Sequence, residues 1–155
     1  MAKMKLGKRL SDPKRQQVGA LPLRLAKDGA PEVLLLTSRT TKRWVIPKGW
    51  TMRKLTLGQA AEREAYEEAG LVGWIYGEDA VGRYEYEKQF DGGDTRMVGV
   101  DVFLLMVSGQ MDAWPEQAER ETAWFEPEQA ARLVAEADLA EIICQVSRWI
   151  VRLTF

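Results

Sequence analysis

The most constraining feature of this sequence is a helical segment, residues 57–69, whose ends and faces are specified by local chemistry. Thr56, followed three residues later by Gln59, has the form of a capping box, which satisfies two free backbone N–H groups at a helix start. Gly70 stands where a left-handed residue commonly ends a helix. An apolar line recurs every four residues, formed by Leu57, Ala61, Ala65 and Ala69. Because most of these residues are small, the pattern predicts a helix lying close against a sheet.

The segments on both sides of this helix have the patterns of strands and of further helices. Strands are expected at residues 17–26, 32–38, 81–90 and 96–107, with short apolar stretches at 44–46 and 123–125. Pro127 can open a second helix, and apolar residues recur at helical spacing from Leu139 to Ile150. This order predicts one α/β domain, a mixed sheet covered by helices. Residues 1–16 are polar and basic, and we expect an irregular arm there.

The residue types that are missing narrow the possible chemistry. The chain of 155 residues contains no His and one Cys, Cys144, so no disulfide can form within it. Zinc sites of thiolate and imidazole are excluded, as are Ser-His and Cys-His nucleophile pairs. Metal ligands must therefore be oxygen atoms, which favour hard ions such as Mg²⁺, Mn²⁺ or Ca²⁺.

Charge and hydropathy limit the possible partners and the expected location. The formal net charge is -1, so the chain lacks the global positive field of a protein that coats nucleic acid. The longest apolar run, residues 102–107, is too short to cross a bilayer. The basic amino terminus is not followed by an apolar stretch of signal-peptide length. We therefore expect a soluble, cytoplasmic monomer or homodimer with a small-molecule partner, without membrane contact, and with nucleic acid disfavoured.

Three carboxylates project from one patch of the predicted helix. At about 100° per residue, Glu64, Glu67 and Glu68 fall within an arc of roughly 100°. Like charges at these spacings repel one another, and a divalent cation would remove the repulsion. A solvated acidic face is the alternative interpretation of the same spacing.

The residues that flank this patch resemble the signature of the Nudix hydrolase superfamily. That signature is Gly, five residues, Glu, seven residues, then Arg-Glu-apolar-x-Glu-Glu-x-Gly-apolar. Gly49 and the segment from Arg63 to Leu71 match its fixed positions, and Leu55 departs from it, where the family has its first Glu. The resemblance implies a Nudix-type α/β/α sandwich. The departure bears on how many metal ions bind.

The resemblance also implies roles for individual residues. Glu64, Glu67 and Glu68 would hold Mg²⁺ or Mn²⁺, Gly49 would offer its carbonyl group, and Arg63 would orient a carboxylate. The metal would lower the pKa of a water molecule that attacks phosphorus, with Glu64 as the first choice of base and Glu67 as a further catalytic carboxylate. Some family members take the base from a distant loop, and the candidates for that position are Glu119 and Glu121.

Further positions look like the diphosphoinositol polyphosphate phosphohydrolase branch of that superfamily. They lie in residues 32–39 and 43–49, at Arg96, and at Arg120 before Trp124. The branch implies a very anionic substrate, such as an inositol pyrophosphate or a diadenosine polyphosphate. The expected phosphate-binding residues are Arg39, Lys48, Arg96 and Arg120, because guanidinium groups suit phosphate oxygens.

Two other functions remain open at the level of the sequence. One is sanitation of modified nucleoside triphosphates, with the base stacked on an aromatic side chain from the set Trp44, Trp50, Tyr84 and Tyr86. The other is a Nudix-fold nucleotide sensor without catalysis, which Leu55 keeps open. The other carboxylates of the signature, Glu64, Glu67 and Glu68, are present, and this argues against the sensor.

Overall fold

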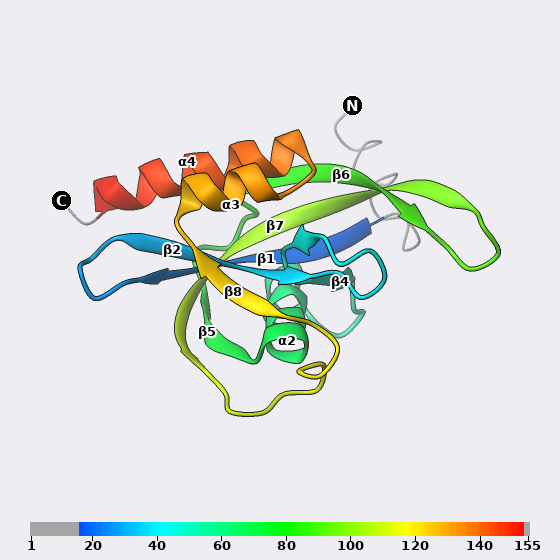
Figure 1. Ribbon diagram of the computed structural model, residues 1–155, viewed down its shortest axis with the longest axis horizontal. Coiled ribbons are helices and arrows are strands. Elements are labelled where there is room, and N and C mark those ends of the chain that lie inside the picture. Colours follow the sequence, from blue (N-terminus) through cyan, green and yellow to red (C-terminus); the bar gives the residue numbers. More distant parts are fainter. Residues whose placement is uncertain (1–15, 154–155) are drawn as a thin grey trace.

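The computed structural model describes the backbone of residues 16–153 and the side chains of residues 16–148 (Figure 1). The elements are β1 (Gln16–Leu25), β2 (Pro31–Thr37), β3 (Trp44–Val45), β4 (Lys48–Trp50), α2 (Leu57–Ala69), β5 (Leu71–Ile75), β6 (Gly82–Gln89), β7 (Thr95–Gln110), β8 (Thr122–Phe125), α3 (Pro127–Leu133) and α4 (Ala137–Leu153). The expected basic arm lies outside the described residues, except for Gln16, which begins β1.

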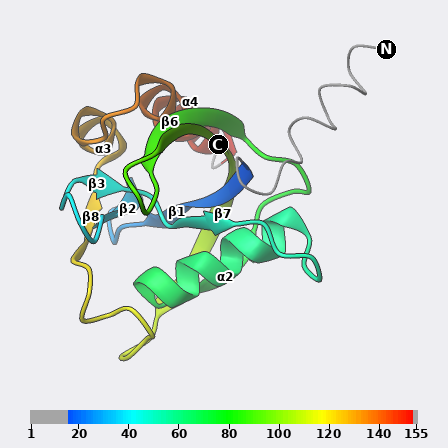
Figure 2. The ribbon, with the colours of Figure 1, turned by 90° about the vertical axis from the view of Figure 1, so that its right-hand side faces the viewer.

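The described strands form one mixed sheet, as predicted. Its central order is β3-β2-β1-β7-β5, with β4 paired to β1, β6 to β7, and β8 to β2. The β1–β7 pair is parallel and runs from Gln16 opposite Gly99 to Leu23 opposite Met106. The other pairs are antiparallel. In Figure 2, α2 covers one face of the sheet, and α3 and α4 lie on the opposite side.

Helix α2 begins and ends where the sequence predicts. The Thr56 hydroxyl accepts a hydrogen bond from the Gln59 backbone, and the Gln59 side chain accepts one from the Thr56 backbone. Gly70 ends the helix with a φ of 69°, in the left-handed region that favours glycine. One part of the prediction is wrong: Leu57 is 42% exposed, because the first turn borders an open pocket beside Ile75.

Two apolar cores lie on the two faces of the sheet. The α2-side core is built around buried alanines of the helix, namely Ala60, Ala61, Ala65 and Ala69, which meet sheet residues such as Val18, Leu34 and Phe103. The α4-side core contains large side chains of α4, namely Leu139, Ile142, Ile143 and Val146, against sheet residues such as Leu21, Val100 and Leu104. Both cores consist of buried apolar side chains, and the sheet separates them.

Two strands were not expected from the sequence. Proline has no backbone N–H to donate, but the Pro47 carbonyl accepts a hydrogen bond from the Ala20 backbone, and β4 follows at once. Strand β5 follows Gly70 directly. Its sequence, Leu-Val-Gly-Trp-Ile, does not alternate between apolar and polar residues, so no strand was predicted there. Among the described residues, no helix is long and apolar enough to cross a membrane.

Candidate active site

The site is built where β4 passes the buried face of α2. Gly49 pairs with Val18 of β1, and this pairing holds β4 at the edge of the helix. A Cβ atom placed on Gly49 would collide with the carboxyl group of Glu64. Gly49 therefore leaves the space that the Glu64 carboxyl group occupies, a steric role in addition to the carbonyl role expected from the sequence.

Glu64 and Glu68 form a buried carboxyl pair. Their exposed fractions are only 9% and 5%, and the two groups share a hydrogen bond. Burial raises the pKa of Glu64, and burial together with the hydrogen bond that Glu68 donates to Glu64 raises the pKa of Glu68 to about 8. The cationic group nearest to the pair is Arg120, whose Nη2 lies 3.9 Å from Glu68 Oε2.

Glu67 and Arg63, the other two predicted catalytic residues of the signature, lie away from the carboxyl pair. Glu67 is half-buried and does not line the cleft beside the carboxyl pair, although its charge contributes to the raised pKa of Glu64. Arg63 is exposed and has no ion pair within the described part of the chain. Across residues 16–148, no three acidic, His or Cys side chains converge on one point. The structure thus brings together two of the three predicted carboxylate ligands, and Gly49, the predicted carbonyl ligand, lines the same cleft.

The chemistry of this donor set fits a hard divalent cation. Both groups offer carboxylate oxygens, and no softer ligand is present because the chain has no His and its single Cys lies in α4. Mg²⁺ commonly uses one or two protein carboxylates and keeps water in its remaining positions. Two converging carboxylates at an open cleft meet that requirement.

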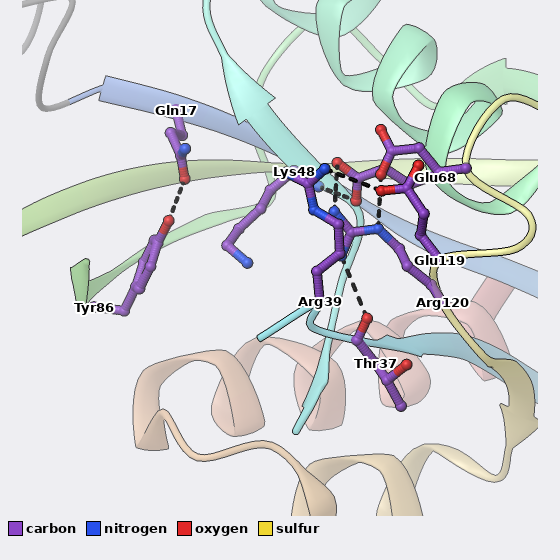
Figure 3. A network of polar contacts seen from close by, with 9 residues as sticks. Gln17, Thr37, Arg39, Lys48, Glu68, Tyr86, Glu119 and Arg120 are labelled. Atoms are coloured by element: carbon purple, nitrogen blue, oxygen red, sulfur yellow. Dashed lines mark hydrogen bonds and ion pairs between the residues drawn. The ribbon is translucent and has the colours of Figure 1, made fainter. Parts of the chain in front are cut away.

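Three of the four predicted phosphate-binding residues line the same cleft as the carboxyl pair. The cleft has a volume of about 780 Å³, and Arg39, Lys48 and Arg120 reach it from β2–β3, β4 and the loop before β8. Figure 3 shows Lys48 between the Tyr86–Gln17 pair on one side and Glu68 with Arg120 on the other. Burial lowers the pKa of Lys48 to about 8. Arg39, Lys48 and Arg120 thus line the cleft together with the carboxyl pair.

Arg96, the fourth predicted residue, is not part of the cleft lining. Its guanidinium group lies 5.2 Å from the centre of the Phe90 ring and 3.6 Å from Asp94. Phe90 does line the cleft, so Arg96 lies behind a residue of the cleft wall and does not line the cleft itself.

The loop before β8 brings in a carboxylate that the sequence did not single out. Glu116 lines the cleft, accepts a hydrogen bond from Arg120 Nε at 2.9 Å, and donates its own backbone N–H to the Glu67 carbonyl. The two predicted loop residues lie elsewhere: Glu119 pairs with Arg39 at 3.1 Å, and Glu121 is held by the Thr37 side chain through its backbone. Neither of them lines the cleft.

The position of Glu116 depends on a contact distant in sequence. The Trp114 ring covers Gly70, where a side chain would collide with it, and the Met111 backbone donates to the Gly70 carbonyl. These contacts fold the loop against the end of α2. No local pattern in the sequence indicates them, so sequence reasoning missed Glu116.

The departure from the signature, Leu55, lies outside the cleft. Its half-buried side chain packs against the α2-side core together with Met52. Leu55 therefore anchors the β4–α2 loop by apolar contact. Of the candidate base-stacking aromatics, Tyr84 is buried and Trp44 packs edge-on against Phe125, whereas Trp50 and Tyr86 line the cleft.

Comparison with known proteins agrees with this architecture. The NUDIX domain family model matches residues 13–146. Nudix hydrolase 21, chloroplastic, of Arabidopsis thaliana is 30% identical over 132 residues, which are 83% of this chain and 64% of that protein. The chain thus spans less than two thirds of that relative's length. Human diphosphoinositol polyphosphate phosphohydrolase 3-beta is 30% identical, over 81% of this chain and 74% of that protein.

Solved structures give the same fold at lower sequence identity. The Ap4A hydrolase of C. elegans, in a binary complex, superposes with a TM-score of 0.63 at 22% identity and covers 88% of this chain and 98% of its own. The NUDIX domain of Shewanella oneidensis NrtR, complexed with ADP ribose, superposes with a TM-score of 0.64 at 17% identity, covering 97% and 99%. The fold predicted from the sequence is confirmed, and the chain belongs to the NUDIX domain family.

Proposed function

We propose that this chain hydrolyses a phosphoanhydride bond in a nucleoside- or inositol-linked polyphosphate, with Mg²⁺ or Mn²⁺ as cofactor. The observation that carries the proposal is the buried Glu64–Glu68 carboxyl pair, which faces a cleft lined by Arg39, Lys48 and Arg120. Burying two carboxyl groups side by side is unfavourable unless a cation compensates for them. The named activities of relatives, hydrolysis of Ap4A and of diphosphoinositol polyphosphates, support this reaction class.

The residues divide the chemical work. A divalent ion bound at the pair would neutralise phosphate oxygens and lower the pKa of water. Glu64 and Glu68 hold the ion, and Glu67 adds negative charge beside them. Glu64, the carboxylate nearer to Gly49, is our first choice for the group that accepts the proton from water, and Glu116 is the loop carboxylate that could share this task. Arg39, Lys48 and Arg120 orient the phosphates.

The proposal is tested with a panel of substrates and one pair of matched variants. The panel holds a diadenosine polyphosphate, an inositol pyrophosphate, a nucleoside diphosphate sugar and an oxidised nucleoside triphosphate, each with Mg²⁺, Mn²⁺ or chelator. Glu64→Gln removes a proposed ligand and base, so kcat should fall by about 10²- to 10⁴-fold. Glu62→Gln is the control, because Glu62 lies on the same helix and borders a different pocket.

The outcomes separate the alternatives. Metal-dependent turnover of either of the first two substrates, lost in Glu64→Gln and kept in Glu62→Gln, supports the proposal. Turnover of the oxidised triphosphate alone would indicate sanitation instead. Nucleotide binding without metal-dependent turnover would indicate a sensor, and undiminished turnover in Glu64→Gln and Glu68→Gln would refute the assigned site.

The location and the assembly state stay predictions. We propose the cytoplasm and a monomer or homodimer, although relatives are named chloroplastic and mitochondrial. Cell fractionation and light scattering would decide these two points.

A further inference from the structure

The loop between β2 and β3 presents two arginines, Arg39 and Arg43, to the cleft of the candidate active site. The loop is a tight turn closed by Ser38. The Ser38 backbone donates a hydrogen bond to the Arg43 carbonyl at 2.9 Å, and the Ser38 hydroxyl accepts one from the Arg43 backbone at 3.1 Å. The backbone of Arg43 is therefore fixed directly before β3 begins.

The two arginines are held by carboxylates that differ in exposure. Arg39 contacts Glu119 at 3.1 Å, and the Glu119 side chain is 46% exposed. Arg43 donates from Nη1 to Glu136 Oε2 at 2.9 Å, and the Glu136 side chain is only 12% exposed. Exposed ion pairs contribute little free energy, because water and salt screen them and both side chains lose freedom in forming them. The Arg43–Glu136 pair is better shielded, and it is the firmer of the two contacts.

Glu136 lies on the turn between α3 and α4 and does not itself line the cleft. It directly precedes α4, and its carbonyl accepts a hydrogen bond from the Ala140 backbone at 3.0 Å. Val134 and Leu139, on either side of it, are buried in the α4-side core. The backbone of Glu136 is thus held by the start of the helix and by the core. Both ends of the Arg43–Glu136 contact have fixed anchors, although 93 residues separate them in the sequence.

The charge and the geometry of Glu136 have opposite effects on a bound phosphate. Burial lowers the pKa of Lys48 to about 8, and the negative charge of Glu136 raises it, so the field of Glu136 reaches the cleft wall. A negative field there opposes the binding of a polyanion. The geometric effect is favourable, because an arginine that is already held in place loses less conformational freedom when it binds phosphate. Altering charge and reach separately therefore distinguishes the two effects.

We infer that Glu136 is a positioning residue, which holds the Arg43 guanidinium group in the cleft for contact with the phosphate chain. The inference rests on the proposed function, because that function places a polyphosphate in this cleft. Glu136 takes up Nη1 of Arg43, and the guanidinium group has further N–H donors for phosphate oxygens. The α3–α4 turn thereby contributes to substrate binding, although it lies far outside the Nudix signature.

Two conservative variants separate position from charge. Glu136→Asp keeps the charge and shortens the side chain by one methylene, and Asp is favoured directly before a helix, so the fold should be kept. Glu136→Gln removes the charge and keeps the length and an acceptor oxygen. Isothermal titration with inorganic tripolyphosphate in EDTA measures the affinity of each variant. Glu136→Asp should weaken binding by about fivefold, whereas Glu136→Gln should change it by less than about twofold.

A double-mutant cycle shows whether Glu136 acts through Arg43. Arg43→Ala should weaken tripolyphosphate binding by about tenfold, and adding Glu136→Asp should weaken it no further. Glu32→Asp is the matched control, because Glu32 forms an ion pair of the same length, 2.9 Å, with Arg24, and neither residue lines the cleft. This control should keep the affinity of the original protein. Melting curves report whether each variant is folded.

Turnover of the substrate identified with the panel gives a second readout. Glu136→Asp should raise KM by about fivefold and change kcat by less than about twofold, because the phosphate contact is made both before and during the reaction. A contact that only joins the α3–α4 turn to the β2–β3 loop would change the melting temperature and leave both the affinity and KM as they are.

The possible results have distinct meanings. Unchanged tripolyphosphate affinity in Glu136→Asp, or tighter binding in Glu136→Gln, would overturn the inference. Further weakening by Glu136→Asp in the Arg43→Ala background would overturn it as well. The expected losses of affinity without turnover under any metal would refute the proposed hydrolysis and keep the positioning role. Metal-dependent turnover with a KM indifferent to Glu136→Asp would do the reverse.

Discussion

The two faces of the sheet are covered by helices of opposite character. Helix α2 buries small alanines together with two carboxyl groups, whereas α4 buries large aliphatic side chains. Small side chains let α2 approach the sheet closely, and this approach brings Glu64 against Gly49 on β4. The comparison teaches that the α4 layer stabilises the fold, whereas the α2 layer gives up apolar burial to place reactive groups.

The largest effect should come from the α4 layer. Ile143 is fully buried in the α4-side core, so Ile143→Ala should lower the free energy of unfolding by about 2–5 kcal/mol. Chemical denaturation measures this loss, and kcat at a temperature where the variant is folded should not change. Leu133→Ala is the control, because Leu133 lies on α3 and is 37% exposed. A fall in kcat that matches the loss of stability would contradict the division between the two layers.

In the α2 layer, the buried carboxyl groups should make the free energy of unfolding depend on pH. Burial raises the pKa of Glu68 to about 8, from an ordinary value of 4.5 in the unfolded chain. Between these values the folded protein binds more protons than the unfolded chain, so stability falls as pH rises from 4.5 toward 8, by at most about 1.4 kcal/mol per pH unit. Glu64 contributes in the same direction.

Lys48 has the opposite effect in a higher range of pH. Its lowered pKa of about 8 costs stability below that pH, and the cost is relieved as pH rises toward 10.5. Melting in EDTA across this range measures both slopes. Glu68→Gln should flatten the acidic slope, as should saturating Mg²⁺. A wild-type protein whose stability is independent of pH between 5 and 8 would show that the carboxyl pair is not buried as described.

A smaller effect, on kcat, is expected where β4 contacts α2 at Gly49 and Glu64. Gly49→Ala places a Cβ atom against the Glu64 carboxyl group, so kcat should fall by about tenfold as that group is displaced. Gly58→Ala on α2 is the matched control, since a Cβ atom there meets its neighbours at 3.6 Å or more. Equal activity of the two variants would mean that the Glu64 position is not critical.

The smallest effect is expected at the departure from the signature. Leu55→Glu should lower the free energy of unfolding by about 1 kcal/mol or less, because a half-buried apolar contact is lost. Since Leu55 does not line the cleft, the number of Mn²⁺ ions bound, measured by titration, should stay the same. Met52→Glu is the control from the same loop. Gain of a second bound ion in Leu55→Glu alone would show that this position limits metal binding.

Local chemistry made the ends of α2 and the carboxylate patch predictable from the sequence. A capping box and a terminal glycine act on their immediate neighbours, so Thr56, Gln59 and Gly70 indicate the helix without reference to the rest of the chain. Strands with clear alternation, such as β6, were predictable for the same reason. The parts that failed depend on distant contacts.

Three particular residues show this limit. Leu57 has the spacing of a buried residue, but its side chain borders an open pocket and is 42% exposed. Glu68 is a charged residue on an acidic helix face, which usually contacts solvent, yet β4 and the loop before β8 cover it. Glu116 enters the site only because Trp114 packs on Gly70. Each position is decided by tertiary packing, which the periodicity of one segment does not contain.

The parallel pairing of β1 with β7 has a consequence for how the chain folds. β1 is the first described strand, and its parallel partner is made only after β6 and its hairpin. Closing so long a loop is entropically costly, and folds dominated by such pairings form slowly. This edge of β1 can pair only after residues 99–106 have been synthesised. β4, and with it Gly49, is held by β1. The strand that carries Gly49 is therefore attached to a strand whose other edge depends on a pairing distant in sequence.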